Sequence, residues 1–113
     1  MAQAKKQLFE IDLQTNAEFF KALAHPARLA ILEYLAETKT CITNDFADEL
    51  PLSRTTVNQH LLELKNAKLV NSHSEGVKTF YCLNMDKIQE FKALLDGFMS
   101  KISDPENCRK QIK

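Results

Sequence analysis

Residues 44–64 read NDFADELPLSRTTVNQHLLEL, and this stretch contains two short helical patterns separated by a proline. The first pattern covers residues 45–50 and stops at Pro51, and the second begins at Ser53. Two helical segments joined by a tight turn predict a helix-turn-helix motif. The second segment also has an apolar stripe at the spacing of a core-facing helix. That stripe consists of Val57, Leu61 and Leu64.

The other side of the second segment carries short or planar polar groups near its start. Such groups read base edges, because arginine forks onto guanine and an amide side chain onto adenine. A helix-turn-helix places its second helix in the major groove of DNA, although any surface helix also shows a polar face. The residues predicted to face DNA are Arg54, Thr55, Thr56, Asn58, Gln59 and His60.

Length and composition limit the class of protein. A chain of 113 residues with 44% hydrophobic residues predicts one domain with a small core. Neither a membrane span nor a signal peptide is visible, so we expect a cytoplasmic protein with no membrane partner. Three cysteines do not make a disulfide scaffold, and we expect free thiols. Fifteen basic and fifteen acidic residues cancel, which predicts weak and salt-sensitive non-specific binding to DNA.

The segments before the motif predict two helices. Residues 1–14 are expected to form an N-terminal arm or a short helix, and Thr15 or Asn16 can cap a helix over residues 17–24. Pro26 opens the next helix, because proline is well tolerated in a first turn. We expect the first helix to bury Phe19, Phe20 and Leu23, and the second to bury Leu29, Leu32 and Leu35.

The segments around the motif predict a small sheet. Residues 40–43 favour β structure directly before the motif, and residues 69–73 and 77–83 predict two strands joined by a turn at 74–76. The fold class is therefore mainly α with a small β-wing, a winged helix-turn-helix.

A final helix that starts at Asn84 or Asp86 carries a heptad-like apolar seam. The seam can pack on the domain's own core, but a terminal apolar helix also suits a second subunit, and operators with two half-sites need a two-fold protein. We expect dimerisation through the terminal helices. The winged domain then covers residues 15–103, and residues 104–113 form a flexible tail. The seam consists of Ile88, Phe91, Leu95, Phe98 and Ile102.

Three segments together resemble the ArsR/SmtB family of arsenic- and metal-sensing repressors: AEFFKALAHPARLAILEYL, LSRTTVNQHLLELKNAKLV and EGVKTFYCLN. The resemblance covers about residues 17–95. It implies a homodimeric repressor that leaves double-stranded operator DNA when an inducer binds. On matching positions it implies that the wing from His73 to Lys78 lies along the DNA backbone. It also implies that DNA is faced by Ser53, Thr55, Thr56, Asn58, Gln59 and His60.

The chain departs from the metal sites of that family. The last helix has Asp86, Glu90 and Asp96 but no histidine, and carboxylates alone suit zinc poorly, so we judge the zinc site absent. The Cys-x-Cys pair that many members carry before the motif is also incomplete, because Thr43 stands two residues after Cys41.

A different pair of thiols follows from the expected strand pairing. In a winged helix the strand before the motif pairs with the second wing strand, which places Cys41 near Cys82. Both face outward if Ile42 and Tyr81 face the core, and their Cβ atoms are then about 4.5–5.5 Å apart. That distance suits a shared soft ion or, with modest movement, a disulfide, and Cys108 could add a third sulfur. Cysteine in a strand is also a common small apolar filler.

We therefore expect a repressor that is released by a thiol-reactive inducer, with trivalent arsenic or antimony favoured and no cofactor required. The alternatives are a redox-sensing or reactive-sulfur-sensing repressor, or a winged-helix protein-interaction module that does not bind DNA. An enzyme is not expected, because the sequence has no nucleophile with a base and no glycine-rich phosphate loop.

Overall fold

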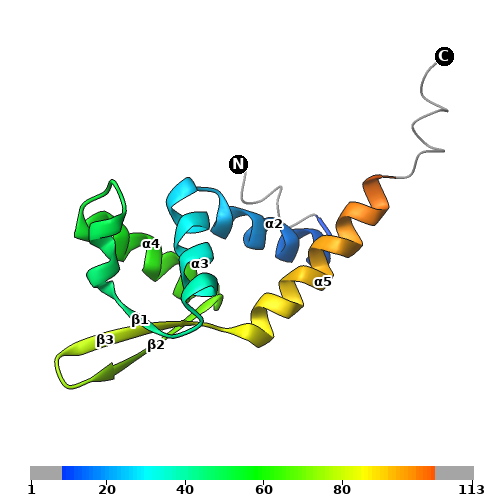
Figure 1. Ribbon diagram of the computed structural model, residues 1–113. Coiled ribbons are helices and arrows are strands. Elements are labelled where there is room, and N and C mark those ends of the chain that lie inside the picture. The colour runs from blue at the N-terminus through cyan, green and yellow to red at the C-terminus, as the bar shows by residue number, and fades with distance from the viewer. Residues whose placement is uncertain (1–8, 104–113) are drawn as a thin grey trace, which may run out of the picture.

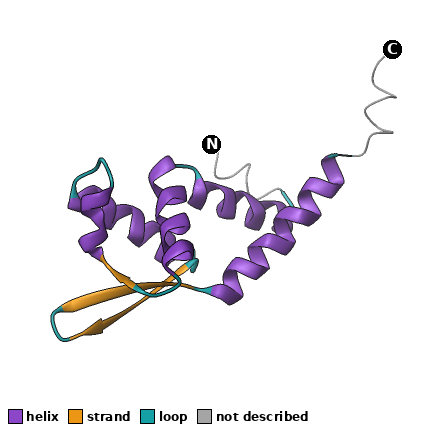
Figure 2. Cartoon of the chain, viewed as in Figure 1, coloured by secondary structure: helices purple, strands orange, loops and turns teal. Residues whose placement is uncertain are grey.

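The computed structural model describes residues 9–103 as four α-helices, one 3-10 helix and a three-stranded antiparallel sheet (Figure 1). Figure 2 shows the sheet at one side of the helical layer, with its long hairpin extending beyond the helices. This mainly helical winged helix-turn-helix confirms the predicted fold class. In chain order the elements are α2 (Ile11–Leu23), α3 (Pro26–Thr38), β1 (Ile42–Thr43), η1 (Asn44–Glu49), α4 (Arg54–Asn66), β2 (Val70–Glu75), β3 (Lys78–Leu83) and α5 (Met85–Ile102).

Helix α2 begins earlier than the sequence predicts. It starts at Ile11 after the N-cap residue Glu10, so the predicted caps Thr15 and Asn16 lie inside the helix. The helix predicted over residues 17–24 therefore begins six residues earlier, within the segment predicted as an arm or a short helix. Residues 11–23 contain neither proline nor glycine, and nothing in the local sequence interrupts the helix before its apolar face begins.

Helix α3 begins at Pro26, as predicted, and His25 is its N-cap residue. The Nδ1 atom of His25 accepts a hydrogen bond from the backbone N–H of Ala27 at 3.0 Å, which satisfies one of the unpaired donors of the first turn. The predicted buried stripe of α3 is wrong at Leu29, which is 49% exposed. The buried face instead begins at Ala27 and repeats every four residues along the helix. The buried residues of α3 are Ala27, Ile31 and Leu35.

The sheet has the strand order β1-β3-β2, with all neighbours antiparallel. Strand β1 pairs with β3 in the register that places Ile42 opposite Tyr81. The hairpin turn lies later than predicted. Glu75 still pairs with Lys78, so the loop consists of Gly76 and Val77. Gly76 has a φ of 63°, a conformation that costs glycine little and other residues more.

The core lies where α3 and α4 cover the base of the wing. The predicted stripe of α4 is confirmed, because all three of its residues are fully buried. Burying each such side chain stabilises the fold by about 1.5–3 kcal/mol, so this stripe fixes which side of α4 faces outward. The largest fully buried side chains are Ile31, Val57, Leu61, Leu64, Leu69 and Val70.

Helix α5 starts after its cap residue Asn84, as predicted, and runs past α2 away from the sheet (Figure 1). The seam is partly used inside the chain: the rings of Phe91 and Phe19 lie 5.1 Å apart, and Phe98 also contacts α2. No residue of α5 is fully buried, and Ile102 near its end is 61% exposed. The helix therefore keeps an apolar side that residues 9–103 do not cover.

Candidate nucleic-acid interface and cysteine pair

The start of α4 is fixed by a side-chain cap. Ser53 is the N-cap residue, and its Oγ accepts a hydrogen bond from the backbone N–H of Thr56 at 3.2 Å. The hydroxyl groups of Ser53 and Thr56 also lie 3.0 Å apart. Such a cap stabilises a helix by about 1 kcal/mol and sets the direction in which the helix leaves the turn. Ser53 and Thr56 thus help to aim the outer face of α4.

That outer face carries most of the residues that the sequence predicts to face DNA. They lie opposite the buried stripe, and their side chains are exposed. Guanidinium and amide groups on one helix face can hydrogen-bond base edges in a major groove. Arg54 also forms ion pairs with Asp45 and Asp48 of η1, which the sequence pattern did not predict. The exposed set consists of Arg54, Thr55, Asn58 and Gln59.

His60 does not belong to this face, and its prediction as a DNA-facing residue is wrong. Its side chain is only 9% exposed, Arg28 Nε donates a hydrogen bond to its Nδ1 at 3.1 Å, and its ring centroid lies 4.2 Å from that of His25. The spacing contains the signal, because His60 lies three residues after Val57 and four before Leu64, on the buried side. His60 therefore helps to attach α4 to α3.

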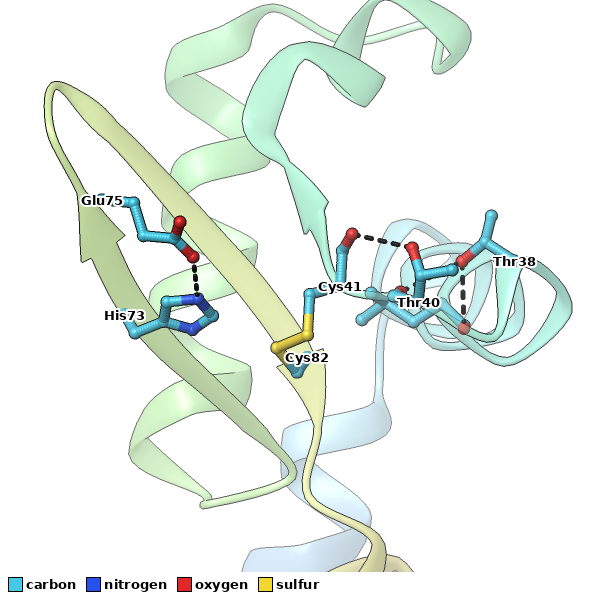
Figure 3. Close-up of a disulfide and its surroundings, with 7 residues drawn as sticks. Thr38, Thr40, Cys41, His73, Glu75 and Cys82 are labelled. Carbon is cyan, nitrogen blue, oxygen red and sulfur yellow. Dashed lines mark hydrogen bonds and ion pairs between the residues drawn. A yellow bond between two sulfur atoms is a disulfide. The ribbon is translucent and has the colours of Figure 1, made fainter.

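Of the two wing residues predicted to approach DNA, Lys78 has an exposed side chain with a positive charge. Lys78 is exposed at the start of β3, beside the exposed loop of the hairpin. His73 instead interacts within the wing, where its Nε2 lies 3.0 Å from Glu75 Oε2 (Figure 3). Its ring also stacks on that of Phe80, with the ring centroids 5.4 Å apart. Both side chains of the His73–Glu75 pair are at least half exposed, so they remain on the surface of the hairpin.

Cys41 and Cys82 form a disulfide (Figure 3). Their Cα atoms lie 4.4 Å apart, because Ile42 pairs with Tyr81 and the residues beside them are brought opposite each other. The predicted cross-strand cysteine pair is confirmed, whereas the expectation of free thiols is wrong for these two residues. Cys108 lies outside the described residues.

The position of this disulfide matters for the interface. Cys41 is exposed and precedes β1, which leads directly into η1 and α4, and Cys82 is half-buried in wing strand β3. The backbone before the pair is held as well, because Thr40 Oγ1 donates a hydrogen bond to the carbonyl oxygen of Cys41 at 2.9 Å (Figure 3). One covalent bond thus joins the segment that leads into η1 and α4 to the wing strand that begins at Lys78.

Over residues 9–103, no three histidine, cysteine or acidic side chains gather closely enough to hold a metal ion. On α5, Glu90 instead forms an ion pair with Lys87 at 3.3 Å. In the same part of the chain, no helix is both long and apolar enough to cross a membrane.

Comparison with known proteins supports the winged helix-turn-helix fold. Residues 23–73 match a family model described as a helix-turn-helix domain. An uncharacterized HTH-type transcriptional regulator of Methanocaldococcus jannaschii is 39% identical over 80 residues, which cover 71% of this chain and 90% of that protein.

Two solved structures share the fold. The crystal structure of a possible transcriptional regulator for arsenical resistance has a TM-score of 0.64 and 31% identity, covering 70% of this chain and 81% of the other. The homodimeric winged helix-turn-helix DNA-binding domain of a possible ArsR-family transcriptional regulator from Mycobacterium bovis has a TM-score of 0.61 and 29% identity, covering 81% and 84%. By name, all three similar proteins are transcriptional regulators or possible transcriptional regulators.

Proposed function

This chain belongs to the ArsR/SmtB family of winged-helix, DNA-binding transcriptional regulators. We propose that it is a homodimeric repressor whose affinity for its operator is controlled by the Cys41–Cys82 pair. The observation that carries this proposal is the disulfide between the strand that leads into the recognition motif and the wing strand beside it. In the reduced dithiol form the repressor binds its operator, and in the disulfide form it is released.

The DNA-binding side of the proposal rests on the exposed polar face of α4 together with Lys78 of the wing. Two such faces are needed for two half-sites, which lie about 34 Å apart on one side of a duplex. The uncovered apolar side of α5 supports a dimer, and the similar domain from Mycobacterium bovis is homodimeric.

The redox chemistry requires only the two thiols and a peroxide. The exposed Cys41 thiolate attacks one peroxide oxygen, forming a sulfenic acid and releasing the other oxygen as water. The Cys82 thiolate then attacks the Cys41 sulfur, and the sulfenic oxygen leaves as a second water. One peroxide is reduced to two waters while two thiols are oxidised to one disulfide, and a dithiol reductant reverses the change.

The coupling to DNA needs a difference in affinity between the two redox forms. The second helix of the motif, α4, is the recognition helix, and the hairpin of β2 and β3 is the wing. Both contact neighbouring parts of a duplex, so both must fit the DNA at once. The disulfide fixes the Cα atoms of Cys41 and Cys82 at 4.4 Å, whereas the dithiol allows β1 and β3 to adjust to the duplex. We attribute release to the loss of this adjustment.

A second candidate inducer is trivalent arsenic. The 31% identity to a possible regulator for arsenical resistance favours it. The reduced pair offers two sulfurs to one soft ion, and Cys108 would supply a third. In this candidate, each thiol replaces one hydroxyl group of arsenite, which leaves as water with the thiol proton. The resulting arsenic–sulfur bonds release the operator, and the peroxide-formed disulfide is a side product.

A binding experiment separates these candidates. Reduced protein is used to select a duplex from a randomised library, and fluorescence anisotropy then gives its affinity for reduced, peroxide-treated and arsenite-treated protein. The proposal expects at least about tenfold weaker binding after peroxide, equal to about 1.4 kcal/mol. Reductant should restore binding, and Cys82→Ser should not respond to peroxide.

Results other than a loss of affinity after peroxide point to the second candidate or contradict the proposal. Release by arsenite alone supports the second candidate. Equal affinity in every state contradicts control by the cysteine pair. Failure to enrich any duplex contradicts the operator-binding repressor itself.

A further inference from the structure

Arg54, the first residue of the recognition helix, is held by two carboxylates of the preceding helix. Its Nη2 lies 3.1 Å from Asp45 Oδ1 and 3.5 Å from Asp48 Oδ2. All three side chains are more than half exposed, at 52%, 66% and 74%. Exposed ion pairs contribute little to fold stability because water screens them.

The geometry follows from the type of helix. Element η1 is a 3-10 helix, in which side chains three residues apart lie directly above one another. Asp45 and Asp48 have that spacing, so both carboxylates occupy one side of η1 and can meet the same guanidinium nitrogen. Because Arg54 is the first residue of α4, the two carboxylates that contact it lie beside the N-terminus of that helix. The helix dipole favours a negative charge there.

The same position is where a DNA phosphate would approach. Helix N-termini attract phosphates, and an arginine there would normally add to that attraction. In this chain the two carboxylates neutralise the arginine and repel phosphate. A phosphate is present at every step of every duplex, whereas a guanine edge that accepts two hydrogen bonds from arginine occurs only in the right sequence.

We propose that Asp45 and Asp48 are specificity-determining residues that withhold Arg54 from DNA phosphates, so that it is released mainly to a correctly placed guanine. Non-specific binding is thereby suppressed, and the discrimination between operator and other DNA is increased. This inference rests on the DNA-binding function of the family and does not depend on the cysteine pair or on the inducer.

The test compares two duplexes in anisotropy titrations of the reduced dimer at several salt concentrations. One duplex is selected from a randomised library by the wild type, and the other is a scrambled duplex of the same composition. For Asp45→Asn/Asp48→Asn, affinity for the scrambled duplex should rise, and the slope of log affinity against log salt should steepen by about 2, one counterion for each arginine of the dimer. Affinity for the selected duplex should rise less, so that discrimination falls about tenfold.

Two matched variants make the result specific. Asp96→Asn removes one charge from an exposed position on α5, as Asp48→Asn does on η1, and should leave discrimination unchanged. In an Arg54→Ala background the two aspartate substitutions should no longer change the salt slope, because the group that they withhold is gone. Asp48→Asn alone provides a milder variant, and thermal unfolding checks that each protein is folded.

Three results would overturn the inference. These are an unchanged scrambled-duplex affinity in the double variant, an equal change for both duplexes, and the same effect without Arg54, which would indicate simple repulsion. A wild type that selects no duplex would contradict DNA recognition itself, which separates that failure from a failure of the aspartate role.

Discussion

Arg28 Nε donates a hydrogen bond to Nδ1 of His60 at 3.1 Å, and this bond joins α3 to the recognition helix. Because Nδ1 accepts the bond, the imidazole is neutral in this arrangement. Burial lowers the pKa of His60, and the neighbouring His25 and Arg28 lower it further. Protonation of His60 would place a buried charge beside a guanidinium and remove the acceptor, so the attachment of α4 depends on a neutral ring.

Stability should therefore depend on pH through His60. A histidine in the unfolded chain has a pKa of about 6.5, and the folded value is lower. Its contribution is complete above that pH and is lost as the pH falls from about 6.5 through the folded pKa, because the unfolded chain binds the proton more readily. We expect the melting temperature of the wild type to fall more between about pH 8 and pH 5 than that of His60→Asn, whose amide oxygen can still accept from Arg28.

His73→Asn is the matched control, since that histidine is exposed on the wing. Its melting profile should follow the wild type. Parallel profiles for His60→Asn and the wild type would contradict the role assigned to His60.

The disulfide should stabilise the domain. Cys41 and Cys82 are 41 residues apart, and closing a loop of that length lowers the entropy of the unfolded chain. We expect reduction, or the Cys41→Ser/Cys82→Ser pair, to lower the free energy of unfolding by about 2–4 kcal/mol. Urea titrations of oxidised and reduced protein measure this difference. Cys108→Ser should leave the difference intact, and equal midpoints for the two redox forms would rule out the effect.

The uncovered end of α5 should hold the dimer together. Ile102 is 61% exposed in one chain, so Ile102→Glu should leave the monomer fold intact while placing a charge in the apolar contact. We expect light scattering to show a shift from dimer to monomer mass, together with weaker DNA binding. Lys101→Glu changes the neighbouring exposed residue and should stay dimeric. A dimeric Ile102→Glu variant would place the interface elsewhere.

Gln59 should contribute to base recognition and not to stability. Its side chain is exposed on the outer face of α4, where an amide can bind both groups of an adenine edge. We expect Gln59→Ala to lose about 1–3 kcal/mol of discrimination at one base position with an unchanged melting temperature. Glu37→Ala, an exposed substitution at the end of α3, serves as the control. A uniform loss on all duplexes would instead indicate a phosphate contact.

The sequence predicts the recognition motif well because local signals agree there. Pro51 and the cap residue Ser53 separate the two helices, and three apolar residues at helical spacing orient the second one. The pairing of Cys41 with Cys82 was also predictable, since strand alternation and the known order of a winged fold place them opposite each other. The sequence left open whether the pair forms a disulfide or holds a soft ion, because residue spacing describes no redox state.

Other features depend on how elements meet in space. His60 has a polar side chain at a position that spacing assigns to the buried side, and only the neighbouring α3 explains why burial is tolerated. The contact of Arg54 with two aspartates depends on the angle between η1 and α4 and on the 3-10 form of η1. Neither the angle nor the helix type is visible in residue spacing.

Control of operator affinity by the Cys41–Cys82 pair is tested most directly by measuring the disulfide fraction and the operator affinity in the same samples. Protein is equilibrated in glutathione buffers from fully reducing to fully oxidising, and each sample is divided between thiol alkylation with mass spectrometry and an anisotropy titration on the selected duplex. The account predicts that operator affinity falls along the same curve as the disulfide fraction rises, and that Cys82→Ser shows a flat, high affinity throughout. An affinity that stays constant while the disulfide forms completely would contradict it.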